Sequence, residues 1–209
     1  GLVGSGRSEI LNAVFGGIRK NSGYLFLDGK KIDIQHPQDA KKHGIGLLTE
    51  DRKKNGIIPG LSIKHNMTIT ILDQLCNFLF IDGKQEDKKA SEFFRKLAIK
   101  APGLDTFIAN LSGGNQQKAI LSKWLMTDLK VLLLDEPTRG IDVGAKAEIY
   151  KIIGNLASMG VSIIMISSEL QELIQICDRF VVLGKGRVQS VLHKHEADEV
   201  TILKAASGT

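Results

Sequence analysis

The stretch that decides the fold is Leu111-Ser112-Gly113-Gly114-Asn115-Gln116-Gln117-Lys118. It stands directly before a helical apolar stripe that includes Ile120 and Trp124. A Ser-Gly-Gly turn at the start of a helix leaves backbone N–H groups free at the positive end of the helix dipole. The stretch therefore predicts a turn that binds an anion such as a phosphate.

Downstream of that turn, a hydrophobic strand ends in two acids, Val131-Leu132-Leu133-Leu134-Asp135-Glu136. Four consecutive aliphatic residues are typical of a central parallel strand that is covered on both faces. Asp135 is suited to holding Mg²⁺, and Glu136 to orienting and polarising a water molecule. Two solvated acids at a strand end would be the plainer interpretation of the same residues.

Upstream, the chain opens on a glycine-rich loop, Gly1-Leu2-Val3-Gly4-Ser5-Gly6-Arg7-Ser8. It matches G-x-x-x-x-G-K-[ST] except at Arg7, so its backbone N–H groups can wrap a phosphate and the Ser8 hydroxyl can bind Mg²⁺. Glycine-rich loops before helices also occur as plain turns. Because such a loop needs a strand to position it, we interpret the sequence as a fragment cut at this motif.

The remaining pattern alternates helices and strands, which indicates βαβ units and a parallel sheet. A hairpin is expected at Asp28-Gly29, and the chain is expected to be mostly helical from Leu61 to Met126. The expected buried strands are Ile45–Leu48, Val131–Leu134, Val161–Ile166 and Phe180–Leu183.

Composition excludes several other classes of protein. The 209 residues suit one α/β domain, 43% of them are hydrophobic, and the net charge of +5 is spread over scattered lysine pairs. Few aromatic residues lie between these lysines, so no nucleic-acid partner is expected. Cys76 and Cys177 lie in apolar surroundings and predict buried, reduced thiols. No signal peptide or membrane-spanning run is present, so membrane attachment would come through a partner protein.

Taken together, the three motifs resemble the ATP-binding-cassette (ABC) family. The similarity is greatest to the C-terminal halves of the duplicated ATPases of ribose-, galactose- and xylose-type sugar importers, and it covers essentially the whole chain. Further stretches that carry it are Ser22-Gly23-Tyr24, Glu50-Asp51-Arg52-Lys53, Asp135-Glu136-Pro137-Thr138-Arg139-Gly140-Ile141-Asp142-Val143-Gly144-Ala145-Lys146 and Ser167-Ser168-Glu169.

The resemblance implies an α/β P-loop NTPase fold for residues 1–209, a single nucleotide-binding domain. Its RecA-like parallel-sheet core would carry a small antiparallel β element near Tyr24–Ile34 and an inserted helical subdomain at about residues 72–126. The resemblance also implies ATP and Mg²⁺ as cofactors, with Ser8 and Asp135 on the metal. Implied nucleotide-binding residues are Gly1, Gly4, Ser5, Gly6, Arg7, Ser8 and Glu9, and, on the nucleotide of a partner half, Ser112, Gly113, Gly114 and Gln116. Implied catalytic positions are Glu136, Asp135, Glu50 and Ser168.

Three of these positions depart from the family at large. Arg7 replaces the Walker A lysine, Glu50 stands where most members have the Q-loop glutamine, and Ser168 stands where they have the switch histidine. Neutral drift would explain each change singly. Together they predict weakened hydrolysis in the chain's own site, while the intact family signature, Leu111 to Lys118, serves the site of the partner half.

The implied function is ATP hydrolysis coupled to carbohydrate uptake at the cytoplasmic face of the cell membrane. Implied partners are an N-terminal ABC half or second cassette in a head-to-tail dimer, transmembrane permease subunits, and indirectly a periplasmic or extracellular sugar-binding protein. A regulatory half that binds nucleotide without hydrolysing it remains an alternative. A soluble ABC protein of translation or DNA repair is a second one, against which Glu50, Asn115 and Ser168 argue.

Overall fold

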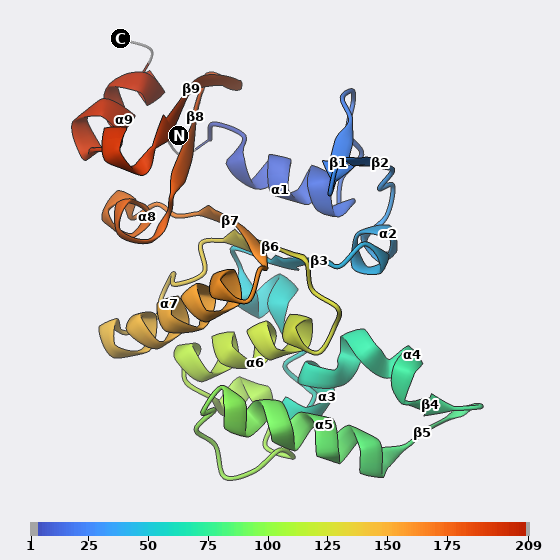
Figure 1. Ribbon diagram of the computed structural model, residues 1–209. Helices are drawn as coiled ribbons and strands as arrows, with labels where there is room; N and C mark the ends of the chain where they lie inside the picture. The colour runs from blue at the N-terminus through green and yellow to red at the C-terminus, as the bar shows by residue number, and fades with distance from the viewer. Residues whose placement is uncertain (1–3, 208–209) are drawn as a thin grey trace.

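The computed structural model of the chain describes residues 4–207. A three-stranded parallel sheet lies at its centre, in the order β3-β6-β7 (Figure 1). Leu132, Leu133 and Leu134 of the middle strand have no solvent exposure, because helices cover both faces of the sheet. This confirms the prediction of a central parallel strand. The strands are β3 (Ile45–Leu48), β6 (Val131–Asp135) and β7 (Ser162–Ile166).

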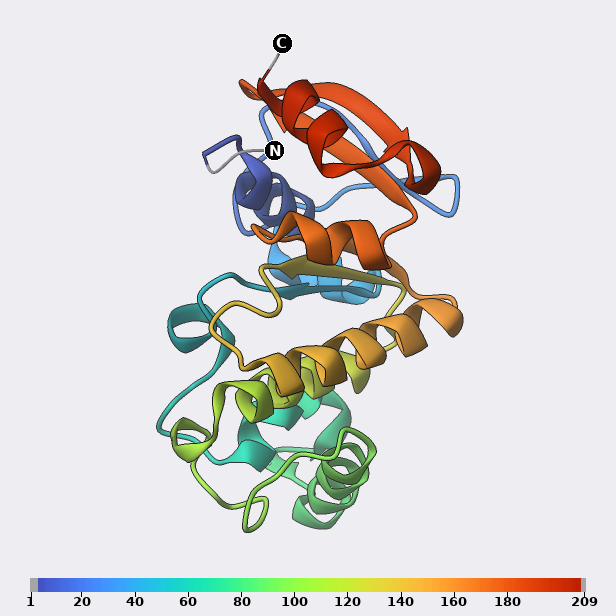
Figure 2. The same ribbon diagram turned by 90° about the vertical axis from the view of Figure 1, so that its left-hand side faces the viewer.

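Two pairs of helices sandwich this sheet, as Figures 1 and 2 show from two sides. Side chains alternate along the middle strand, so Leu133 packs with Leu11 on one face while Leu132 and Leu134 pack with Trp124 on the other. One pair is α1 (Arg7–Phe15) and α2 (Pro37–Lys42), and the opposite pair is α6 (Gly113–Leu125) and α7 (Val143–Ser158).

A mostly helical lobe lies beside α6, on the far side of α6 from the sheet (Figure 1). The expected helical stretch is interrupted by a short hairpin whose tip residue, Phe78, is 93% exposed. Cys76 lies in this hairpin and is exposed, so the prediction of two buried thiols is wrong for Cys76. The elements between β3 and α6 are η1 (Arg52–Gly56), α3 (Ile63–Thr68), η2 (Ile69–Ile71), α4 (Leu72–Leu75), β4 (Cys76–Asn77), β5 (Phe80–Ile81), α5 (Gly83–Lys96) and η3 (Ile108–Asn110).

Antiparallel hairpins lie outside the central sheet near both ends of the chain. The expected turn at Asp28-Gly29 is confirmed, and both residues have positive φ, as a tight hairpin requires. The hairpins are β1 (Leu25–Leu27) with β2 (Lys30–Ile32), and β8 (Arg179–Gly184) with β9 (Arg187–His193); α8 (Leu170–Ile176), η4 (Lys194–Glu196) and α9 (Glu199–Ser207) complete the fold.

Two of the expected buried strands differ from the prediction. The segment from Phe180 pairs antiparallel with β9 and alternates between buried and exposed residues, so it is no member of the parallel sheet. The segment from Val161 does join that sheet, but Ile164 is 47% exposed. Among residues 4–207, nothing pairs with the outer edge of β7. In the same range, no helix combines the length and apolar character needed to cross a bilayer.

Candidate functional site

The glycine-rich turn is open toward solvent and leads straight into α1. Gly4 and Gly6 have φ values of +80° and +88°, and a Cβ added to either would meet no atom of residues 4–207 within 4 Å. Such conformations favour glycine and leave space for a group close to the backbone. The turn thus presents the positive N-terminal end of α1, which bears Arg7, Ser8 and Glu9, to an anion. Gly1, the other expected glycine, lies outside the described residues.

Three buried oxygen atoms without partners among the described residues belong to the glycine turn and to the ends of β3 and β6. Asp135 is 3% exposed, and its Oδ1 has no hydrogen-bond partner among the described residues. Burial raises the pKa of Asp135, and a hydrogen bond with Ser8 opposes this rise. The hydroxyls of Ser5 and Thr49 are also buried and unpaired within residues 4–207. Leu48 of β3 pairs with Leu134 of β6. The next residues, Thr49 and Asp135, therefore lie at the carboxyl ends of neighbouring strands.

These oxygens fit a hard cation together with a polyphosphate. Carboxylate and hydroxyl oxygens are ligands that Mg²⁺ accepts, and Mg²⁺ is typically held by one or two carboxylates plus substrate phosphates and water. The described residues contain no cluster of three His, Cys, Asp or Glu side chains that would hold a metal without such help. Unsatisfied buried oxygens are otherwise costly, so a ligand at this position would satisfy them.

The carboxylate of Glu136 is held by three contacts. Its Oε2 accepts hydrogen bonds of 2.9 Å from both the backbone N–H and the hydroxyl of Ser168. Its Oε1 lies 3.9 Å from Nη2 of Arg7, whose Nη1 donates to the carbonyl of Ser167 at 3.2 Å. Glu136 also has a left-handed φ of 50°, a conformation that is uncommon for non-glycine residues and costs conformational energy. The structure thus brings Arg7, Glu136 and Ser168 into contact.

Glu50 points to a different partner. Its carboxylate forms an exposed ion pair with the guanidinium of Arg139. Its charge nevertheless contributes to raising the pKa of Asp135, behind the larger effect of burial, so the two carboxylates are within electrostatic reach. Glu50 therefore lies near the candidate metal site while its side chain is engaged by the loop that begins at Arg139.

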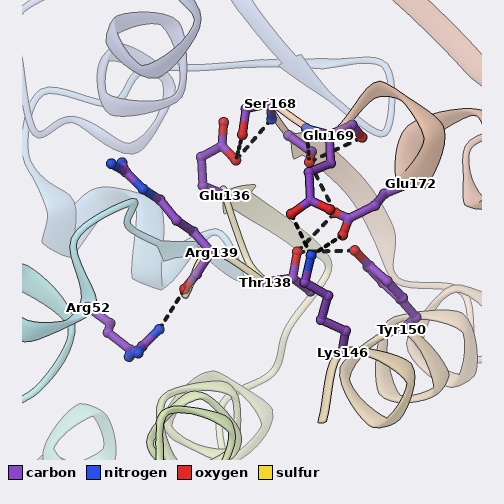
Figure 3. A network of polar contacts seen from close by, with 10 residues as sticks. Arg52, Glu136, Thr138, Arg139, Lys146, Tyr150, Ser168, Glu169 and Glu172 are labelled. Carbon is purple, nitrogen blue, oxygen red and sulfur yellow. Dashed lines mark hydrogen bonds and ion pairs between the residues drawn. The ribbon is translucent and has the colours of Figure 1, made fainter. Parts of the chain in front are cut away.

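A second polar network joins that loop region to the segment around Ser168 (Figure 3). At its centre, Glu172 accepts hydrogen bonds from Thr138 at 2.9 Å, Lys146 at 2.9 Å and Ser167 at 3.1 Å. Burial disfavours the charged form of Glu172 and so acts to raise its pKa. The hydrogen bonds from Tyr150, Lys146, Thr138 and Ser167 outweigh burial and lower the pKa of Glu172 to about 2.

The signature turn lies on the opposite face of the sheet from α1 (Figure 1). Ser112 is exposed and precedes α6 as its N-cap, and its hydroxyl accepts from Asn115 at 3.0 Å. Gly114 is buried, and a Cβ there would lie 2.5 Å from the Cβ of Ala145. Gln116 is 5% exposed, with its Nε2 donating to Ile108 and its Oε1 accepting from Arg52. Of the residues expected to contact the nucleotide of a partner half, Ser112 is therefore the exposed one, whereas Gly114 and Gln116 contact residues of their own chain.

Sequence reasoning missed several residues of this region. Thr49 has a usable signal, because it lies between a buried strand and Glu50. The partners of Glu172 have none, since Lys146 of α7 and Glu172 in the first turn of α8 are distant in the sequence and meet only in the folded chain.

The chain is similar in sequence to known proteins over its whole length. A protein-family model described as "ABC transporter" matches residues 1–139. The chain is 46% identical over 209 residues to the xylose import ATP-binding protein XylG of Geobacillus kaustophilus (strain HTA426), covering 100% of this chain and 42% of that protein. It is 48% identical over 209 residues to the ribose import ATP-binding protein RbsA of Clostridium perfringens (strain SM101 / Type A), with the same coverage. The arabinose import ATP-binding protein AraG 1 of Burkholderia cenocepacia (strain HI2424) is 50% identical over 208 residues, covering 99% of this chain and 41% of that protein. The chain therefore spans about two fifths of the length of these relatives.

Solved structures with low sequence identity share the fold. The ADP conformation of MJ1267, an ATP-binding cassette of an ABC transporter, superposes with a TM-score of 0.80 at 19% identity, covering 99% of this chain and 85% of that one. A dimeric post-hydrolysis state of the cassette MJ0796 bound to ADP and Pi superposes with a TM-score of 0.76 at 20% identity, covering 92% of this chain and 82% of that one. These likenesses show an α/β P-loop NTPase fold of the kind found in ATP-binding cassettes, as the sequence predicted.

Proposed function

The chain belongs to the ABC transporter family, and on that premise we propose that it is one ATP-binding cassette of an importer that couples ATP hydrolysis to carbohydrate uptake. Its relatives are sugar-import ATP-binding proteins of more than twice its length. We therefore propose that it is the C-terminal half of such a protein, with α3 to α6 acting as the helical subdomain of the cassette.

The observation that carries this proposal is the set of unsatisfied oxygens beside the open glycine turn. Ser5, Thr49 and Asp135 each bury an oxygen atom that has no partner among the described residues. We propose that Gly4, Gly6 and the N–H groups of α1 bind the phosphates of ATP, while Ser8 and Asp135 hold Mg²⁺. Bound ATP supplies the phosphoryl group that is transferred to water, and Mg²⁺ neutralises part of its charge.

Within this site, Glu136 is the residue suited to orient and polarise water. Ser168 and Arg7 engage both of its oxygens, so it is not free for this role in the present arrangement. Arg7 is also directed toward Ser167 and Glu136 rather than standing free above the glycine turn. We propose that this cassette binds ATP but hydrolyses it weakly. The exposed Ser112 turn would then serve the nucleotide of a second cassette.

The partners follow from the same proposal. A second cassette would pair head to tail with this one, so that each signature turn faces the other's phosphates. Transmembrane permease subunits would hold the pair at the cytoplasmic face of the membrane, and a sugar-binding protein would act on those subunits from the other side.

Sugar uptake by the full-length protein tests this function. The protein would be produced with its permease and binding protein in a host that lacks its own pentose and hexose ABC importers. We expect uptake of radiolabelled ribose, xylose, arabinose or galactose that depends on ATP, and loss of uptake with Ser112→Arg. A system that hydrolyses no ATP and accumulates none of the four sugars would contradict the proposal.

A further inference from the structure

The segment Arg52–Gly56, which we name the strap, lies along one face of α6. Arg52 reaches Gln116, the backbone of Gly56 packs against Ile120, and Lys123 donates to the Gly56 carbonyl at 3.1 Å. Residues 116, 120 and 123 follow the spacing of a single helix face. The strap therefore contacts α6 along two consecutive turns.

Arg52 extends the strap to a second target, the loop that begins at Arg139. Its Nη1 donates to the carbonyl of Arg139 at 2.8 Å (Figure 3). Its Nη2 donates to the carbonyl of Gly140 at 3.2 Å. Its Nε donates to Oε1 of Gln116 at 3.3 Å. One planar guanidinium thus bonds two segments that are distant in the sequence, a geometry that a lysine ammonium cannot reproduce.

The surrounding glycines leave room for this guanidinium. A Cβ at Gly113 would lie 2.6 Å from Nη2 of Arg52, so any side chain there would displace the guanidinium from its present position. Gly140 has a φ of +66°, a left-handed backbone conformation that favours glycine. Gln117 adds a parallel link, since its Nε2 donates to the carbonyl of Pro137 at 2.6 Å.

We propose that Arg52 is a positioning residue that joins the signature turn and the loop from Arg139 to Asp142 into one body. The two segments then reach the nucleotide of the partner cassette together, and the helical lobe keeps its orientation relative to the sheet. This proposal rests on the proposed function, because it assigns a role to a surface that acts on a second cassette.

Distance measurement by pulsed electron paramagnetic resonance tests the structural half of this proposal. Spin labels would be attached to cysteines at the exposed positions Lys88 of the lobe and Asn155 of α7, in the full-length protein with its other cysteines replaced by serine. We expect Arg52→Met to broaden the distance distribution with and without MgATP. The control is Lys53→Met, an exposed neighbour on the strap whose ammonium has no partner among residues 4–207, and it should keep the wild-type width.

Steady-state kinetics of the same proteins tests the functional half. We expect Arg52→Met to lower kcat for ATP hydrolysis about tenfold, with KM changed less than about twofold. The kcat of Arg52→Lys should lie between those of the wild type and Arg52→Met. If Arg52→Met does not fold, Arg52→Lys is measured in its place. An unchanged distance distribution, or an unchanged kcat, would overturn the proposal. Absence of any ATP turnover in the wild type would instead overturn the proposed function, and the distance distributions would still decide the role of Arg52.

Discussion

The guanidinium of Arg7 faces the carboxylate of Glu136, with 3.9 Å between Nη2 and Oε1, while Nη1 donates to the carbonyl of Ser167. A charged fork of this kind makes stronger contacts with carboxylate and carbonyl oxygens than a neutral donor does. The side chain of Arg7 is therefore bound to Glu136, which is expected to orient water, and to the segment at Ser167, which is expected to lie near the γ-phosphate. Its pairing links the end of β6 to the end of β7.

This pairing leads us to expect little ATP hydrolysis by the isolated chain. Steady-state phosphate release should stay near that of a Glu136→Gln control. Arg7→Lys combined with Ser168→His should raise turnover only modestly, because Glu50 keeps an additional carboxylate near Asp135. Robust turnover by the unmodified chain, lost on Glu136→Gln, would contradict the assignment of a weakened site.

Gly114 is expected to be intolerant of any side chain for a reason internal to the chain. Gly114→Ala would place its Cβ 2.5 Å from that of Ala145 and force α6 away from α7. We expect a loss of about 1–3 kcal/mol in the free energy of unfolding, measured by urea denaturation. Gly83→Ala, where an added Cβ meets no atom within 4 Å, is the control. Equal stability of the two variants would show that the close approach is relieved elsewhere.

The sequence predicted the sheet strand β6 and the hairpin at Asp28-Gly29, because each has a local signal. Motifs singled out Arg7, Glu136 and Ser168 one by one, but no sequence pattern indicated the contacts between them. It did not predict that the segment from Phe180 pairs with β9, since an apolar run does not identify its partner strand. The exposed hairpin around Phe78 was missed because its apolar residues look like part of a buried helix. The roles of Arg52 and Glu172 depend on tertiary contacts alone.

Lys123 should make stability depend on pH in the alkaline range. Burial lowers its pKa to about 8 from the ordinary 10.5. Below pH 8 the folded protein must bury an ammonium, whereas between pH 8 and 10.5 the folded form releases a proton that the unfolded chain retains. Stability relative to Lys123→Met should therefore rise across that window, by at most about 3 kcal/mol. Chemical denaturation of both proteins at several pH values measures this, and a constant difference would contradict it.

Glu172 should contribute stability that is lost in acid. Its folded pKa of about 2 lies below the ordinary 4.5, so its contribution is complete above pH 4.5 and disappears as the pH falls toward 2. With allowance for solvent screening, we expect Glu172→Gln to cost roughly 1 kcal/mol more at pH 6 than at pH 3. Thermal unfolding monitored by circular dichroism provides the comparison. Gln175→Ala, at an exposed position of the same helix, should show no such trend, and a pH-independent effect of Glu172→Gln would count against the network.

Use of the signature turn on a second cassette is tested most directly by comparing Ser112→Arg with Arg7→Ala in the full-length protein with its membrane subunits. Ser112 is chosen because it is exposed, whereas Gly114 packs against Ala145. We expect Ser112→Arg to lower ATP turnover by roughly 100-fold while ATP binding to this cassette stays nearly unchanged. Arg7→Ala should weaken ATP binding here and reduce turnover by no more than about threefold. If Arg7→Ala damages turnover more than Ser112→Arg does, this cassette is the catalytic site and not the partner of one.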